Sequence, residues 1–343
     1  MTADLKLGLQ LGYWASTPPT YDWVALARQA EDLGYDSVWT AESWGSDVFT
    51  PLAYLAASTS RIRLGTGIAQ MAARTPTATA MHAITLDHLS GGRVILGLGL
   101  SGPQVVEGWY GRPYPKPLAR TREYVEVIRK VLRRETVTND GEYYPLPYQG
   151  PDSMGLGKPL RTNLRPLRKD LPLFLGAEGP KNVALTAEIA DGWLPLYYVP
   201  ERPEVYADQI AAAKEGFEIT AMVHLAFTGP APEDIEQALW PIKGALAFYI
   251  GGMGAKGANF HKNLMVRMGY EAEADHIQQL FLDGNRDEAV MAVPTAFADE
   301  ISLVGPPERI KERLAAWRES PVTTLLVTAR EGETLRGLAE LVL

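Results

Sequence analysis

The chain has 343 residues, no cysteine, and a formal net charge of −8 from 33 basic and 41 acidic side chains. This length allows one large α/β domain or two smaller ones, and 46% hydrophobic with 22% charged residues is typical of a globular protein. The acidic balance disfavours nucleic acid as a partner, because phosphate binding needs a basic surface. The lack of cysteine excludes disulfides, iron–sulfur clusters and thiolate metal sites, and it fits a reducing compartment.

Neither a targeting segment nor a membrane segment is recognisable in the sequence. The start of the chain, Met1–Leu7, lacks the basic stretch and long apolar run of a signal peptide. There is no run of about 18 apolar residues. The five histidines show no spacing typical of metal ligands. We therefore expect a cytoplasmic protein with no membrane anchor and no metal centre.

Strand-like and helical segments alternate from the start of the chain. Apolar runs predict strands near residues 5, 35, 62 and 93. Thr75 before Pro76 is a helix start signal, because threonine can cap the free N–H groups and proline is tolerated at the first helical position. The predicted helices are 21–33, 50–57, 75–89 and 118–134.

Two long segments interrupt this alternation in the second half of the chain. Residues 139–171 are rich in proline, glycine and tyrosine and predict an extended loop, and residues 230–294 predict a mainly helical insertion. Around them the pattern resumes, with strands near residues 171, 192, 219 and 323 and helices at 180–190, 203–214 and 307–317.

Eight strands alternating with helices require a parallel sheet with right-handed crossovers. We therefore predict an α/β fold, a (β/α)₈ TIM barrel formed by residues 1–343 as a single domain with these two insertions. An open, doubly wound sheet is the alternative. Insertions of this kind often make subunit contacts, so we expect a homo-oligomer.

A glycine run, Gly97–Gly102, follows the fourth strand and has the spacing G-x-G-x-x-G of a dinucleotide-binding turn. In a Rossmann unit this run follows the first strand, opens directly into a helix, and precedes a strand-end acidic residue by about 20 positions. Here later glycines and prolines forbid a long helix, and Glu123 lies inside a predicted helix. We interpret the glycines as a turn that passes close to a ligand or to neighbouring backbone.

A second glycine turn, Gly176–Asn182, joins the fifth strand to a helix that begins near Pro180. Free N–H groups and the helix dipole at such a point favour a phosphate, and Lys181 adds positive charge. In a barrel this turn lies on the face where ligands bind. An ordinary strand–helix turn is the alternative.

Taken together, several ordered segments resemble the luciferase-like monooxygenase superfamily, in particular its branch of coenzyme F420-dependent oxidoreductases. The resemblance covers nearly the whole chain, and no one motif decides it. The segments that carry it are Gly34–Glu42, Ile62–Ile68, Thr85–Gly99, Gly179–Lys181, Ala190–Trp193 and Val304–Glu308.

The resemblance implies a TIM barrel with a flavin-type ring bound at its C-terminal mouth and hydride transfer at C5 of a deazaflavin. It also implies a non-proline cis peptide bond between Gly67 and Ile68, behind the ring, and a phosphate site at the second glycine turn. The implied cofactor contacts are Thr40, Gly67, Ile68, Ala69, Gly99, Leu100, Ser101, Gly102, Gly176, Ala177, Glu178, Gly179, Pro180 and Lys181. Lys256, His261 and Lys262 could meet the acidic tail of F420, or lie on a solvated loop.

The sequence departs from the family after the second strand, where sugar-phosphate and alcohol dehydrogenases of this branch carry a histidine. Glu42-Ser43-Trp44 stands there instead. Glu42 is therefore the candidate catalytic residue for proton transfer. The alternative is that Glu42 pairs with a nearby arginine and holds a loop.

The resulting prediction is an oxidoreductase that uses F420 to exchange hydride with a small organic substrate. One alternative is a monooxygenase of the same superfamily that uses reduced FMN and oxygen. Another is a non-catalytic flavin-binding relative.

Overall fold

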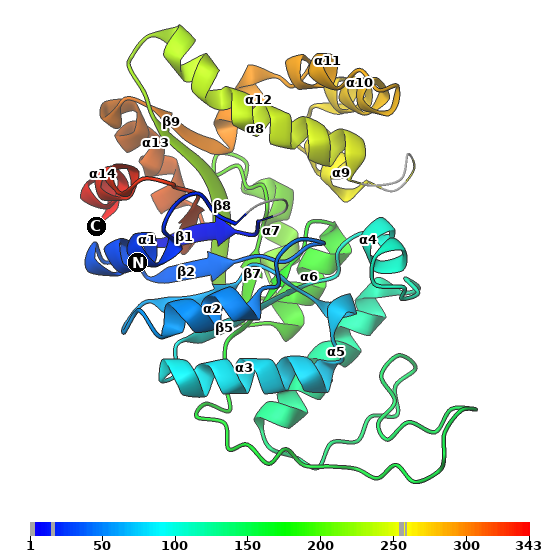
Figure 1. The fold of residues 1–343 in the computed structure, drawn as a ribbon. Coiled ribbons are helices and arrows are strands. Elements are labelled where there is room, and N and C mark those ends of the chain that lie inside the picture. The colour runs from blue at the N-terminus through cyan, green and yellow to red at the C-terminus, as the bar shows by residue number, and fades with distance from the viewer. Residues whose placement is uncertain (1–3, 15–17, 254–256, 258) are drawn as a thin grey trace.

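Eight parallel strands form a closed barrel at the centre of the molecule (Figure 1). The computed structural model describes residues 4–14, 18–253, 257 and 259–343. The barrel closes because β10 pairs with β1 on one side and with β8 on the other. In barrel order, the strands are β1 (Lys6–Gly12), β2 (Ser37–Thr40), β3 (Arg63–Thr66), β5 (Val94–Gly99), β6 (Leu173–Gly176), β7 (Gly192–Leu194), β8 (Glu218–Phe227) and β10 (Thr324–Val327). The predicted barrel is thereby confirmed, and the open sheet is excluded.

Helices surround the barrel, and the start signal predicted at Thr75 is confirmed. Thr75 accepts a hydrogen bond from the N–H of Ala78 at the start of α3, and Asp22 caps α1 in the same way. Gly91 ends α3 in a left-handed conformation, with φ of 70°. These outer helices are α1 (Trp23–Asp32), α2 (Phe49–Ala56), α3 (Pro76–Ser90), α4 (Pro103–Gly108), α5 (Pro117–Leu132), α6 (Pro180–Ile189), α7 (Glu204–Ile210), α13 (Pro307–Glu319) and α14 (Gly332–Val342).

The barrel interior has its own small core, separate from the larger core between strands and helices. Trp39, Ile95, Phe174, Leu194 and Leu326 are buried together there, with Ile68 packed against them. Glycines make room for the large rings: a Cβ at position 65 would lie 2.2 Å from the ring of Trp39. A Cβ at Gly97 would lie 2.0 Å from the carbonyl oxygen of Thr66, so Gly97 serves the close packing of two strands.

Both predicted interruptions separate barrel strands in the structure. Residues 133–172 contain only two isolated β-bridges, Val137–Leu160 and Asn139–Leu146, and run as an extended segment away from the barrel (Figure 1). The second segment follows β8 and holds α8 (Pro232–Gly252), α9 (Phe260–Arg267), α10 (Glu271–Leu282), α11 (Arg286–Met291) and α12 (Thr295–Glu300).

The sequence analysis missed several elements, the short helix α4 among them. Strand β9 (Ser302–Gly305) pairs with the second half of β8, which extends past the barrel after its first half has paired with β10. A two-residue strand, β4 (Ala69–Gln70), continues the line of β3 and leads into a 3₁₀ turn, Met71–Ala73. Helix α14 also falls outside the predicted elements. No helix in the described part of the chain is long and apolar enough to span a membrane.

Candidate functional site

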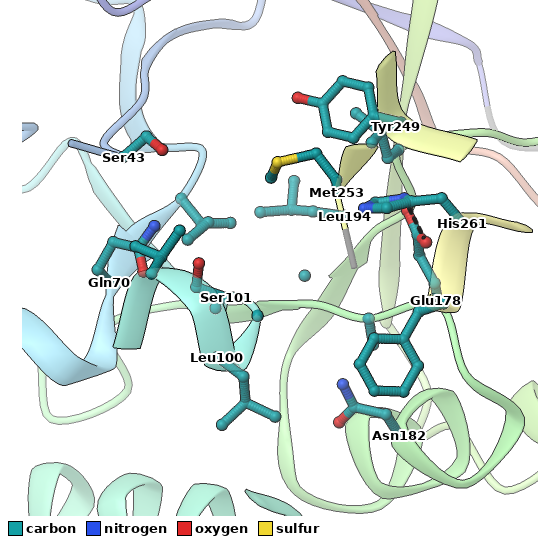
Figure 2. Close-up of a pocket in the computed structure, with 18 of the residues that line it drawn as sticks. Ser43, Gln70, Leu100, Ser101, Glu178, Asn182, Leu194, Tyr249, Met253 and His261 are labelled. Carbon is teal, nitrogen blue, oxygen red and sulfur yellow. Dashed lines mark ion pairs between the residues drawn. The ribbon is translucent and has the colours of Figure 1, made fainter. Parts of the chain in front are cut away.

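A cavity of about 1280 Å³ lies at the C-terminal ends of the barrel strands. Its lining comes from the ends of β1 and β7, from the turns after β2, β3, β5 and β6, and from one side of α8 and α9. Figure 2 shows its two walls, with Ser43, Gln70 and Ser101 on one side and Glu178, Asn182, Tyr249 and His261 on the other. A cavity at this end of a parallel barrel is where such folds place their ligand sites.

The floor of the cavity contains the peptide bond between Gly67 and Ile68, which is cis. The Gly67 N–H donates to the carbonyl oxygen of Thr40 at 2.7 Å, and the Gln10 amide donates to the Gly67 carbonyl at 3.3 Å. A Cβ at position 99 would lie 2.6 Å from Ile68, and one at position 176 would lie 3.2 Å from it. The glycines that end β5 and β6 therefore leave space for the Ile68 side chain.

The second glycine turn forms one wall and starts helix α6. Gly179 is the cap residue and Pro180 the first helical residue, so the Lys181 N–H is among the groups with no partner inside the helix. Arg267, from α9, donates to the Glu178 carbonyl oxygen at 2.8 Å and also faces the cavity. Helix N–H groups, Lys181 and Arg267 together suit a phosphate.

A close contact between two side chains links this turn to α9. The Glu178 carboxylate lies 2.7 Å from Nδ1 of His261, and both side chains line the cavity (Figure 2). The Tyr249 ring packs edge-on against His261, with centroids 4.7 Å apart. Burial raises the pKa of Tyr249 to about 12, so its hydroxyl stays protonated at neutral pH.

Glu42 lines the opposite wall and is held by Arg74. The two Glu42 oxygens accept from the guanidinium at 2.7 and 2.8 Å, and one also accepts from the Gln70 N–H at 2.9 Å. The side chain is 6% exposed. This is the arginine pairing that the sequence analysis named as the alternative for Glu42, and it anchors the segment just after the cis bond.

Most of the predicted site residues meet around this cavity. Two predicted cofactor contacts lie outside its lining: Thr40, whose hydroxyl donates to the Val48 carbonyl oxygen, and Ala69, which is buried in the outer core. Of the three residues considered for an acidic tail, His261 lines the cavity, whereas Lys262 pairs with Asp275 at 2.6 Å. Lys256 lies outside the described residues. The predicted residues that line the cavity are Glu42, Gly67, Ile68, Gly99, Leu100, Ser101, Gly102, Gly176, Ala177, Glu178, Gly179, Pro180 and Lys181.

Apart from His261, sequence reasoning missed the residues that the second interruption contributes. Tyr249 and Met253 come from the end of α8, and Arg267 comes from α9. None belongs to a motif. The available signal was the glycine-rich stretch beginning at Gly251, which lies close to Tyr249 and Met253 in the sequence.

The closed parallel barrel and its C-terminal cavity define a TIM-barrel protein with a candidate ligand site. The model of the luciferase-like monooxygenase family matches residues 9–324, and the chain belongs to this family. A Mycobacterium tuberculosis protein provisionally named a coenzyme F420-dependent oxidoreductase is 50% identical over the full length of both chains. A 5,10-methylenetetrahydromethanopterin reductase of Archaeoglobus fulgidus is 27% identical over 94% of this chain and 93% of its own.

Solved structures show the same fold. The coenzyme F420-dependent tetrahydromethanopterin reductase of Methanopyrus kandleri superposes with a TM-score of 0.79 at 24% identity, covering 99% of each chain. An F420-dependent secondary alcohol dehydrogenase has a TM-score of 0.75 at 15% identity, covering 98% of each chain.

Proposed function

We propose that this chain is a coenzyme F420-dependent oxidoreductase that exchanges hydride with a small organic substrate. The observation that carries the proposal is that one cavity holds both the Gly67–Ile68 segment and the phosphate-suited turn at Gly179–Lys181. The 50% identity to a relative named for F420 supports the same cofactor.

The residues present fit such a cofactor. Gly99 and Gly176 leave space for the Ile68 side chain, against which a flat ring can lie, and the start of α6 with Lys181 and Arg267 suits its phosphate. When bound, F420 would supply a hydride at C5, which carries two electrons to or from the substrate. The chain's own part is to hold the ring and substrate in contact and to move one proton.

Glu42 is the residue we propose for that proton. It adjoins the segment after Ile68 through its bond with the Gln70 N–H, whereas the Glu178–His261 pair lies beside the phosphate-suited turn. Removal of a positioned proton-transfer group typically lowers turnover by about 10²–10⁴-fold.

Titration of the purified chain with F420 and with FMN tests the cofactor. We expect F420 fluorescence to be quenched at micromolar concentrations and FMN to bind at least about tenfold more weakly. If FMN binds as tightly as F420 or more tightly, the result would favour the alternative of an FMN-dependent monooxygenase. Binding of neither compound would favour the non-catalytic relative.

A charge reversal tests the phosphate position separately. Lys181→Glu places a carboxylate at the start of α6 and should weaken F420 binding at least about tenfold, because the new charge repels the phosphate. The control is Lys311→Glu, at an exposed site on α13 away from the cavity. If Lys181→Glu binds F420 with unchanged affinity, the proposal that the phosphate lies at this turn is wrong.

A further inference from the structure

The charges that line the cavity are concentrated on one wall. Lys181, His261 and Arg267 are the basic residues among its described lining, and all three lie at the glycine turn or on α9. Glu178, the acidic residue of that wall, is paired with His261. A cofactor phosphate bound at α6 would occupy this wall.

The other wall offers no free charge among the described residues. Glu42 is already bonded to Arg74, and the remaining polar side chains there, such as Ser43, Gln70 and Ser101, are neutral. Tyr110 donates its hydroxyl to the Ser43 carbonyl oxygen at 2.8 Å, which joins the loop after β2 to the segment after α4. An anionic substrate would find no cation on this side to balance its charge.

Large aromatic rings belong to the lining of the same cavity. They come from the segments after β1, β2 and α4 and from helices α8 and α9, and all are exposed. The aromatic collar consists of Tyr13 (41% exposed), Trp44 (46%), Trp109 (65%), Phe248 (41%) and Phe260 (45%). Exposed rings that separate parts of the chain bring to one cavity are typical of a ligand site, because scattered surface residues would not gather in this way.

The cavity is also large for one ligand. Its volume of about 1280 Å³ exceeds the roughly 300–1,000 Å³ of sites that hold a drug-sized molecule, so a substrate can share it with a cofactor.

From the one-sided charge and the aromatic collar, we infer that the substrate is an uncharged molecule with an extended apolar body, such as a long-chain or polycyclic ketone. Its body lies against Trp44 and Trp109, away from the wall that the phosphate would occupy, with the reducible group directed inward toward Ile68. That the substrate is reduced or oxidised here rests on the proposed function. The uncharged, apolar character of the substrate is inferred from the cavity alone.

Calorimetric titration with methyl ketones from 2-butanone to 2-decanone tests the inference, using protein with and without oxidised F420. We expect the affinity to rise with chain length by up to about fourfold per methylene, the factor that corresponds to about 0.8 kcal/mol for each one buried. The same ketones ending in a carboxylate should bind at least about tenfold more weakly than their uncharged counterparts.

Variants of the aromatic collar localise the effect. Trp109→Ser should weaken 2-decanone binding at least about tenfold and leave 2-butanone binding nearly unchanged. Trp240→Ser is the matched control, because Trp240 is 49% exposed on α8 and does not line the cavity. Circular dichroism of both variants checks that the fold is intact.

Two outcomes would overturn the inference while leaving the proposed function standing. In the first, the protein binds F420 but its affinity for the ketones does not change with their chain length. In the second, it binds the carboxylates more tightly than the uncharged ketones. Failure of F420 itself to bind would instead overturn the proposed function. The affinities of the ketone series for the cofactor-free protein measure the apolar character of the substrate site independently of that result.

Discussion

At the scale of single residues, Glu42 shows how one side chain can serve the site in two ways. Its bonds to Arg74 and to the Gln70 N–H fix the chain just beyond the cis bond, and its place in the cavity lining keeps it within reach of a bound molecule. Hydrogen bonding to a guanidinium is roughly twice as strong as bonding between neutral groups, so this contact defines the local geometry.

Glu42→Gln separates these two roles. The neutral amide leaves Arg74 less well paired, and we expect the free energy of unfolding to fall by about 1–3 kcal/mol in urea denaturation. If Glu42 transfers the proton, kcat should also fall at least about 100-fold and the pH profile should lose one limb. A uniform, pH-independent loss would indicate positioning only, and full turnover would end the proton proposal.

A matched control for stability is Glu188→Gln. Glu188 also forms a bidentate pair, with Arg122, but both partners are more than half exposed. Exposed pairs contribute about 0–1 kcal/mol, so this variant should unfold close to the parent.

At the scale of elements, contacts between neighbouring units decide where strands begin. Glu31, near the end of α1, accepts hydrogen bonds from the N–H groups of Ser60, Arg61 and Ile62 at 2.6–3.1 Å, directly before β3. Burial alone would raise the pKa of Glu31, but these bonds outweigh it and lower the pKa from its usual 4.5 to about 2. The carboxylate therefore stabilises the folded chain in its charged form.

The resulting pH dependence has a definite sign. Because the folded pKa of Glu31 is depressed, its stabilisation is complete above about pH 4.5 and is lost as the pH falls toward 2. Glu31→Gln should therefore be less stable than the parent by about 1–2 kcal/mol near pH 7, after allowance for solvent screening, and the difference should shrink below pH 4.

Urea unfolding at several pH values measures this difference, with Glu312→Gln on the exposed side of α13 as control. A gap between parent and Glu31→Gln that stays constant with pH would contradict the assignment.

At the scale of the whole molecule, the extended segment 133–172 leaves apolar side chains in solvent. Met154, Leu156 and Leu160 are 85%, 78% and 66% exposed. Exposed apolar side chains gathered on one segment are typical of a contact surface. The homo-oligomer expected from the sequence stays a prediction, and this segment is where we expect the copies to meet.

Light scattering on a sizing column tests the assembly. The parent chain should elute as a dimer or larger species, and the double variant Met154→Ser/Leu156→Ser should shift it toward the monomer, because the apolar contact is lost. Leu89→Ser, at a 68% exposed site on α3, should leave the assembly unchanged. A parent that is monomeric at all concentrations would refute the expectation.

The sequence by itself determined the barrel and the face on which the site lies. Alternating apolar runs and helix start signals are local features, and parallel strands bring their C-terminal ends to one edge, so the glycine turns at Gly99 and Gly176 could be placed together in advance. Gly67 was placed there by the family resemblance. Strand β9 escaped prediction because its pairing depends on β8 extending beyond the barrel, which no local pattern records.

Only the tertiary structure decided which side chains complete the site. Glu42 and Arg74 are 32 residues apart, and Glu178 meets a histidine 83 positions later, so their pairing depends on how separate elements pack. Packing likewise kept Thr40 and Ala69 out of the cavity lining and brought Trp44, Trp109, Phe248 and Phe260 into it. Periodicity fixes the face of an element, but the neighbour that each side chain meets is set by long-range contacts.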